Sequence, residues 1–186
     1  MTYSNLEKEE LIVILADIQK QFDEMKEKVE DLILIDEVTN LYNRKILYKT
    51  LSYEIKRSVR GYGHLSVILL SINNFEGIIE KYGEEVSNIL LRQVADLLLN
   101  TIRSIDIVGM YDKNEFMLIL PDMNPKKGMA VAERIQKLMD KEIFPVDNRV
   151  TLSVGLKNYE GEPINKFIEI TERNLHLAKK EYGRQK

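Results

Sequence analysis

The order of helix-like and strand-like segments from residue 36 onward is the strongest constraint on the fold. Apolar residues recur every three to four positions, as in amphipathic helices, at 39–60, 84–103, 125–140 and 164–182. Between these segments lie strand-like runs at 65–72, 106–120 and 149–156. The resulting βαββαβ order predicts an α/β (α+β) chain with a split βαβ, ferredoxin-like fold. Its sheet is expected to be mixed and mainly antiparallel, with the two long helices on one face.

The run at 106–120 reads as a β-hairpin with a polar tip at residues 112–115, DKNE. We expect strands 65–72 and 106–111 to be the two central strands, which places this tip and the segment after Ile72 at the same end of the sheet. A ligand at that end would reach both, although the fold alone does not identify it. The alternative is an ordinary solvated turn, because Asn and Asp suit hairpin geometry.

A seven-residue apolar repeat in residues 5–35 predicts a coiled coil before this domain. Its members are spaced four and three residues apart, with charged residues between them: Leu11, Leu15, Ile18, Phe22, Met25, Val29 and Leu32. The chain therefore divides into an N-terminal helix, residues 1–35, and a globular domain, residues 36–186, and we expect a parallel homodimer. The alternative is a helix that lays its apolar stripe on its own domain.

Composition excludes several classes of function. The net charge is −3 and the sequence pI is near 5.6, so neither nucleic acid nor a membrane surface is an expected partner, and an anionic ligand needs a local basic pocket. Without cysteine, the chain has no disulfide, thiolate zinc site or cysteine nucleophile. The apolar run near the N-terminus is too short for a signal peptide or membrane span, so a cytoplasmic protein is expected.

Five ordered blocks resemble the GGDEF domain of bacterial diguanylate cyclases. They are DEVTNLYNRK (36–45), SINNFEGIIEKYG (71–83), MYDKNEF (110–116), VTLSVGL (150–156) and KEYGR (180–184). The family patterns that they resemble are D-x-L-T-G-L-Y-N-R-R, D-I-D-x-F-K-x-I-N-D-x-x-G, R-Y-G-G-D-E-F, V-T-x-S-x-G and K-x-x-G-R. The resemblance covers about residues 36–186 and implies the palm type of split βαβ fold, which nucleotide cyclases and polymerases share.

The resemblance also implies a damaged metal site. In the family, two carboxylates hold the magnesium ions that bridge the GTP phosphates, and here those positions are Ser71 and Asn114. Magnesium prefers anionic oxygen ligands, and phosphoryl transfer depends on the metal charge. We therefore expect no cofactor and no magnesium binding.

Other active-site positions depart from the family in the same way. Asp112 and Lys113 replace two glycines that let the triphosphate approach the hairpin, and Asp112 adds an anion there. Ile79 replaces the asparagine that reads guanine, and Asn88 replaces a second guanine-reading acid. Glu115 is retained. The combined losses predict that the protein is not an enzyme.

A second family site is retained in register. Active members often carry R-x-x-D five residues before the signature, and here this is Arg103-Ser104-Ile105-Asp106; Arg134, in the AERI block, matches a second arginine of that product-inhibition site. Arginine forks bind guanine O6 and N7, and a carboxylate accepts from the guanine N–H donors. The alternative is a surface ion pair at a helix end and a solvated arginine on the next helix.

These inferences lead to a specific expectation of function. The chain is expected to be a catalytically inactive GGDEF domain that acts as a cyclic di-GMP receptor through Arg103, Asp106 and Arg134 and signals to a protein partner as a homodimer. One alternative is a dimeric protein-interaction scaffold that binds no nucleotide. Another is a domain that senses GTP without turnover, against which Ile79 and Asp112 argue.

Overall fold

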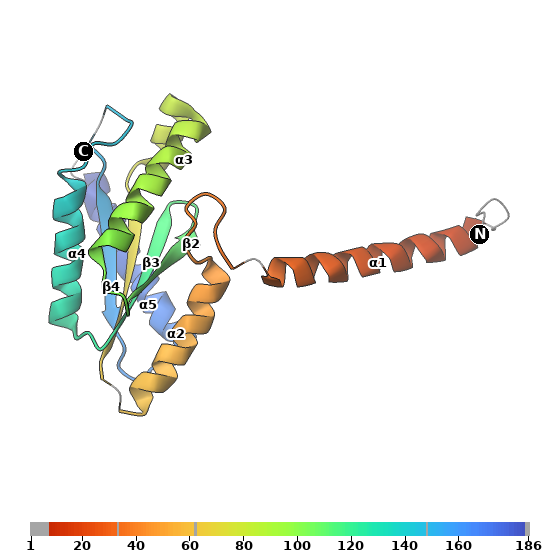
Figure 1. Cartoon of the computed structure of the whole chain (residues 1–186), viewed down its shortest axis with the longest axis horizontal. Helices are drawn as coiled ribbons and strands as arrows, with labels where there is room; N and C mark the ends of the chain where they lie inside the picture. Colours follow the sequence, from red (N-terminus) through yellow and green to blue (C-terminus); the bar gives the residue numbers. More distant parts are fainter. Residues whose placement is uncertain (1–7, 33, 62, 148, 185–186) are drawn as a thin grey trace. The chain divides into compact units, whose positions relative to one another are not determined.

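The computed structural model describes residues 8–32, 34–61, 63–147 and 149–184. Contacts divide the chain into two units, Met1–Leu34 and Ile35–Lys186, which are described separately. The first unit contains helix α1 (Lys8–Leu32). The second contains, in chain order, α2 (Arg44–Val59), β1 (Leu65–Ile72), α3 (Phe75–Thr101), β2 (Ile107–Asp112), β3 (Glu115–Pro121), α4 (Pro125–Met139), β4 (Leu152–Asn158) and α5 (Ile164–Arg184) (Figure 1).

The four strands form one sheet in the order β2-β3-β1-β4, and each neighbouring pair is antiparallel. A parallel pairing occurs at the isolated bridge between Tyr42 and Gly109. The predicted fold class is confirmed. The prediction that residues 106–111 form a central strand is wrong, because β3 lies beside β1 and β2 lies at the edge. β3 takes the central place because residues 116–120 form an unbroken apolar run that is buried on both faces.

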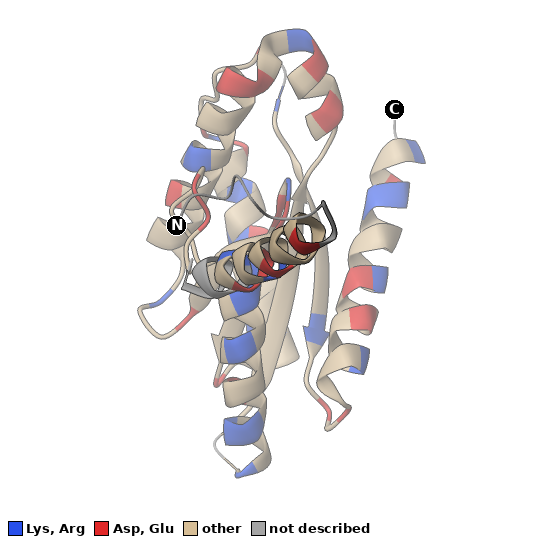
Figure 2. Cartoon of the chain, turned by 90° about the vertical axis from the view of Figure 1, so that its right-hand side faces the viewer, with Lys and Arg blue, Asp and Glu red and all other residues tan. Residues whose placement is uncertain are grey.

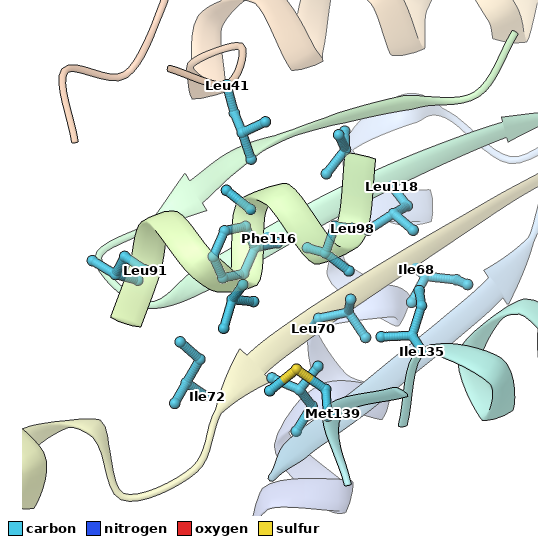
Figure 3. Packing of buried hydrophobic residues seen from close by; sticks show 14 of the residues in the cluster. Leu41, Ile68, Leu70, Ile72, Leu91, Leu98, Phe116, Leu118, Ile135 and Met139 are labelled. Atoms are coloured by element: carbon cyan, nitrogen blue, oxygen red, sulfur yellow. The ribbon is translucent and has the colours of Figure 1, made fainter. Parts of the chain in front are cut away.

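Helices cover both faces of the sheet. Successive side chains of β1 point to opposite faces, so alternate residues pack against different helices. Ile68 and Leu70 belong to a core cluster with α3 and α4, part of which is drawn in Figure 3. Val67 and Leu69 belong to a second cluster with α2 and α5. The expectation of two long helices on one face is met by α3 and α4, but it omitted the second layer.

Two helices begin at different residues from those predicted. α3 begins at Phe75 and not at residue 84, and it is interrupted at Gly83, which has φ 82°. Glycine adopts this non-helical backbone conformation without strain. The break interrupts the apolar periodicity, so the first part of α3 does not continue the repeat of residues 84–103. α2 begins at Arg44, and its N-cap is Asn43, whose side chain accepts a hydrogen bond from the Ile46 amide at 3.1 Å.

The segment that enters the globular domain, residues 35–42, folds back on itself and is called the entry segment. The Asp36 carboxylate accepts hydrogen bonds from the amide and hydroxyl of Thr39 at 2.8 and 2.7 Å. Leu41 is buried in the α3 and α4 cluster. The Tyr42 carbonyl accepts from the Met110 amide at 2.8 Å, so the entry segment pairs with β2.

Helix α1 presents the predicted apolar repeat as an exposed stripe. Leu15, Ile18, Phe22 and Met25 are between 54% and 65% exposed. The repeat positions at 29 and 32 lie outside the residues whose side chains are described. No described helix is long and apolar enough to cross a bilayer. The parallel homodimer through α1 stays a prediction.

Candidate functional site

The hairpin tip and the end of β1 meet, as the sequence predicts. The Asn114 amide donates one hydrogen bond to the Ser71 hydroxyl at 3.2 Å and one to the Ile72 carbonyl at 2.8 Å. Ser71 lies opposite Glu115 in the β1 and β3 register. The two positions that carry metal carboxylates in the family therefore bond directly to each other.

This donor set does not fit a magnesium ion. Ser71 and Asn114 are neutral, and Asn114 directs its amide N–H groups toward both neighbouring oxygens. The Glu115 carboxylate forms an ion pair with Lys179 at 2.5 Å. No group of three or more His, Asp or Glu side chains in the described part of the chain is arranged to hold a metal. Magnesium requires several hard, preferably anionic, oxygens, which this corner does not offer.

A pocket of about 420 Å³ lies beside the hairpin and brings the other degenerate positions together. Ile79 and Asn88 on α3 line it together with Asp112 and Lys113 of the tip. Its remaining wall combines apolar side chains with polar and charged ones: Val38, Phe75, Leu91, Met110 and Tyr111 with Asp36, Asn43, Arg44, Glu84 and Ser87. The Ile79 side chain offers no hydrogen bond, and the carboxylate of Asp112 lines the pocket together with the cations Lys113 and Arg44. The pocket thus combines the positions at which the chain departs from the family patterns.

Arg103 and Asp106 close the turn between α3 and β2. The Asp106 carboxylate accepts from the Arg103 amide at 3.0 Å, from its Nε at 3.1 Å and from its Nη2 at 2.5 Å. The Arg103 Nη2 also donates to the Pro121 carbonyl at 2.9 Å. The Asp106 side chain is only 1% exposed, whereas that of Arg103 is 43% exposed. Because the Arg103 guanidinium donates to this carboxylate through two nitrogens, the turn holds a preformed Arg–Asp fork. The same hydrogen bonding raises the pKa of Arg103.

Arg134 extends from α4 to the same end of α3. Its Nη2 donates to the carbonyl of Thr101, the last residue of α3, at 2.5 Å, and its side chain is otherwise exposed. A cation at a helix C-terminus is favourable because it meets the free carbonyls there. Because Arg103 follows Thr101 by two residues, the structure gathers all three predicted ligand residues around the end of α3.

Sequence reasoning missed a polar cluster behind the hairpin. The Tyr111 hydroxyl donates to the Glu172 carboxylate at 2.5 Å, and it lies 3.3 Å from both the Tyr48 hydroxyl and the Arg44 Nη2. The Arg44 guanidinium also lies 4.4 Å from the centre of the Tyr111 ring. Both Tyr111 and Arg44 fall on letters of the family patterns, which is the signal that identifies them. The cluster ties β2 to α2 and α5.

Replacing Tyr111 by phenylalanine tests this cluster through alkaline pH. Burial, followed by the hydrogen bond to Glu172, raises the pKa of Tyr111 above its ordinary value of 10.0. The unfolded chain therefore loses this proton at a lower pH than the folded chain, so the stabilisation is complete below pH 10 and declines above it. Urea unfolding at pH 8 and at pH ~10.5 should show a smaller alkaline loss for Tyr111→Phe than for the parent. Equal losses would contradict the cluster.

Comparisons with known proteins agree with the fold and the motifs. The profile of the family described as "Diguanylate cyclase, GGDEF domain" matches residues 33–185. The chain is 28% identical to diguanylate cyclase DosC of Escherichia coli K12 over 151 residues, 78% of this chain and 33% of the relative. It is 30% identical to the response regulator PleD of Caulobacter vibrioides NA1000 over 137 residues, 71% of this chain and 30% of the relative. The chain thus spans about a third of these relatives' length.

Solved structures show the same fold. Diguanylate cyclase SiaD of Pseudomonas aeruginosa, in complex with its activator SiaC, gives a TM-score of 0.76 at 23% identity, covering 93% of this chain and 68% of that one. The GGDEF domain of DgcB from Caulobacter crescentus, in complex with c-di-GMP, gives 0.75 at 21% identity, covering 79% and 90%. With the profile match spanning nearly all of the globular unit, the chain belongs to the GGDEF family of diguanylate cyclase domains.

Proposed function

We propose that this protein is a GGDEF domain without cyclase activity that acts as a cyclic di-GMP receptor and signals as a homodimer to a protein partner. The observation that carries the receptor role is the grouping of Arg103, Asp106 and Arg134 around the end of α3. Arg103, Asp106 and Arg134 together carry one net positive charge, in a chain that is acidic overall. The complex of the similar DgcB domain with c-di-GMP adds support from the family.

Ligand binding would exchange one set of hydrogen bonds for another. Both carboxylate oxygens of Asp106 already accept from Arg103, while Arg103 Nη1 has no hydrogen-bond partner among the described residues. In the proposed complex, Arg103 swings onto the O6 and N7 edge of a guanine, and Asp106 accepts from the N–H donors of that base. The Asp106 carboxylate is thus paired with Arg103 before binding and with the guanine N–H donors after it. This exchange avoids the cost of a buried unpaired charge.

The inactive state rests on the corner formed by Ser71, Asn114 and Glu115. Phosphoryl transfer depends on metal charge to offset the phosphate charges, and this corner offers a hydroxyl, an amide and a carboxylate already paired with Lys179. Incubation with GTP and Mg²⁺ or Mn²⁺, followed by chromatography, should give no cyclic di-GMP above a blank without protein. Product formation that scales with protein concentration would refute this part of the proposal.

Calorimetric titration with cyclic di-GMP tests the receptor role. The parent is expected to bind at micromolar concentration, and both Arg103→Ala and Arg134→Ala should weaken binding at least ~10-fold, because each removes a charge-assisted contact. Arg92→Ala, which removes an exposed arginine from the middle of α3, is the matched control and should bind as the parent does.

Two results would overturn the receptor role. The first is an absence of heat at ~50 µM ligand, and the second is equal binding by Arg103→Ala and the parent. A thermal shift with GTP but not with cyclic di-GMP would favour GTP sensing in the pocket beside the hairpin. No shift with either nucleotide would favour a scaffold that binds only protein.

A further inference from the structure

Helix α2 is strongly basic although the chain as a whole is acidic. Residues 44–60 contain one acid, Glu54, and six cations: Arg44, Lys45, Lys49, Lys56, Arg57 and Arg60. In Figure 2, the blue bands of Lys and Arg follow one another along α2, which is labelled in Figure 1. This segment alone carries a net charge of +5, while the net charge of the chain is −3. Positive charge is therefore concentrated on α2, while the rest of the chain is acidic.

Three residues of α2 and its C-cap residue form a continuous exposed line, which we call the basic ridge: Lys49, Tyr53, Lys56 and Arg60. They are spaced four, three and four residues apart, so they lie on one side of the helix. All four are exposed, and Tyr53 is 66% exposed at the centre of the line. The opposite side of α2 carries Leu47 and Leu51, which are fully buried against the sheet.

The cations of the basic ridge have no acidic partner among the described residues, although Lys56 and Arg60 lie at the C-terminus of α2, where positive charge is favourable. The side chains of Lys49, Lys56 and Arg60 make no hydrogen bond or ion pair with any residue that the structure describes. By contrast, Arg57 pairs with Glu54 at 3.1 Å and with Asp122 at 2.7 Å. Like charges four residues apart destabilise a helix by about 0.2–0.5 kcal/mol. Cations kept close together without acidic partners indicate a partner from outside the domain.

A depression of about 360 Å³ lies at the end of the basic ridge. Tyr53, Lys56, Arg57 and Arg60 line it. The charge of Arg57 is offset by its two acidic neighbours, so Lys56 and Arg60 supply the free positive charge, and the Tyr53 ring supplies an apolar wall. Tyrosine and arginine at the centre of a contact are the residues that most often dominate protein–protein affinity.

We propose that the basic ridge is a docking surface for an acidic segment of a protein partner. Charge complementarity favours this partner over others. A short helical segment with carboxylates at the same spacing as the ridge cations would contact the basic ridge without contacting the acidic rest of the chain. A nucleic acid or an anionic bilayer would instead approach a chain whose remaining residues carry a net −8, obtained by removing +5 from −3. The inference goes beyond the receptor role and does not depend on cyclic di-GMP binding.

Fluorescence anisotropy with a synthetic acidic peptide tests the inference. The probe is a labelled ~16-residue helical peptide with glutamates spaced four, three and four residues apart, compared with the same peptide carrying glutamine at those positions. Combined Lys49→Gln, Lys56→Gln and Arg60→Gln should weaken binding at least ~10-fold, and the parent's affinity should fall with added salt. Tyr53→Ala should weaken binding ~3-fold or more without changing the salt dependence.

The matched control neutralises three exposed lysines of α4, by Lys126→Gln, Lys127→Gln and Lys137→Gln, and should bind the peptide within ~2-fold of the parent. The ridge variant should melt close to the parent's temperature, because it relieves the repulsion between Lys56 and Arg60 but also removes cations from the C-terminus of α2, where they are favourable. Equal weakening by both triple variants, no peptide binding at ~200 µM, or tighter binding to single-stranded oligonucleotides or phosphatidylserine vesicles would each overturn the proposal. Cyclic di-GMP titration of the ridge variant should match the parent, so the two proposals fail separately.

Discussion

Gly155→Ala is expected to lower the stability of the domain by about 3 kcal/mol or more, because its Cβ would enter the backbone of α5. The added atom would collide with the Leu175 amide nitrogen and lie 2.6 Å from the Thr171 carbonyl oxygen. These are helix backbone atoms, which cannot rotate away as a side chain does, so α5 must move off β4. For a chain of this size, the loss corresponds to a fall in melting temperature of ~10 °C in a circular dichroism melt.

Gly183→Ala is the matched control, since both glycines belong to motifs shared with the family. Gly183 lies near the end of α5 and would place its Cβ in open space. Alanine is the better helix former by up to about 1 kcal/mol, so this variant should melt at the same temperature as the parent or slightly higher. Similar melting temperatures for the two variants would show that α5 does not pack on β4 as closely as described.

Asp106→Ala is expected to cost about 2–3 kcal/mol even without any ligand. The carboxylate is almost completely buried and accepts hydrogen bonds from both the amide and the guanidinium of Arg103. Its loss leaves the Arg103 amide without an acceptor and frees the side chain that also binds the Pro121 carbonyl. Urea unfolding at equal protein concentration measures the change.

The control for Asp106 is Asp140→Ala, which removes an exposed ion pair with Arg149. Surface pairs contribute ~1 kcal/mol at most, so this loss should be clearly smaller. If both substitutions cost the same, the Arg–Asp fork is an ordinary surface pair, as the simplest interpretation of the sequence allows. Because Arg103→Ala also uncovers the carboxylate, its cyclic di-GMP titration has to be made at a temperature where the variant is folded.

The fold was predictable from periodicity wherever packing follows apolar spacing. The hairpin and the apolar run of β1 appear at the predicted places, and α4 and α5 begin where they were predicted to begin. Periodicity failed at Gly83, where a backbone break hides the first part of α3. The order of the strands in the sheet could not be predicted in the same way. A strand takes a central place when both of its faces are buried, and this burial depends on helices that are distant in sequence.

The candidate site was predictable only where family patterns supply the spacing. The R-x-x-D motif predicted that Arg103 and Asp106 belong to one site. The contact of Arg134 with Thr101 could not be predicted, because it depends on how α4 packs beside α3. Likewise, the family pattern aligned Asn114 with a position that holds metal in the family, whereas the bond of Asn114 to Ser71 follows from the β1 and β3 register. The Tyr111 cluster joins three elements and has no signal in apolar periodicity.

The pairing of Tyr42 with β2 has a consequence for aggregation. An edge strand with free N–H and C=O groups is a template on which a second chain can add a strand. The Tyr42 carbonyl takes the Met110 amide, and a Cβ on Gly109 would clash with that same carbonyl, so the entry segment lies directly against this edge. Removing residues 35–42 together with α1 would uncover β2 and leave a domain prone to edge-to-edge assembly, whereas cutting before Ile35 would keep the edge protected.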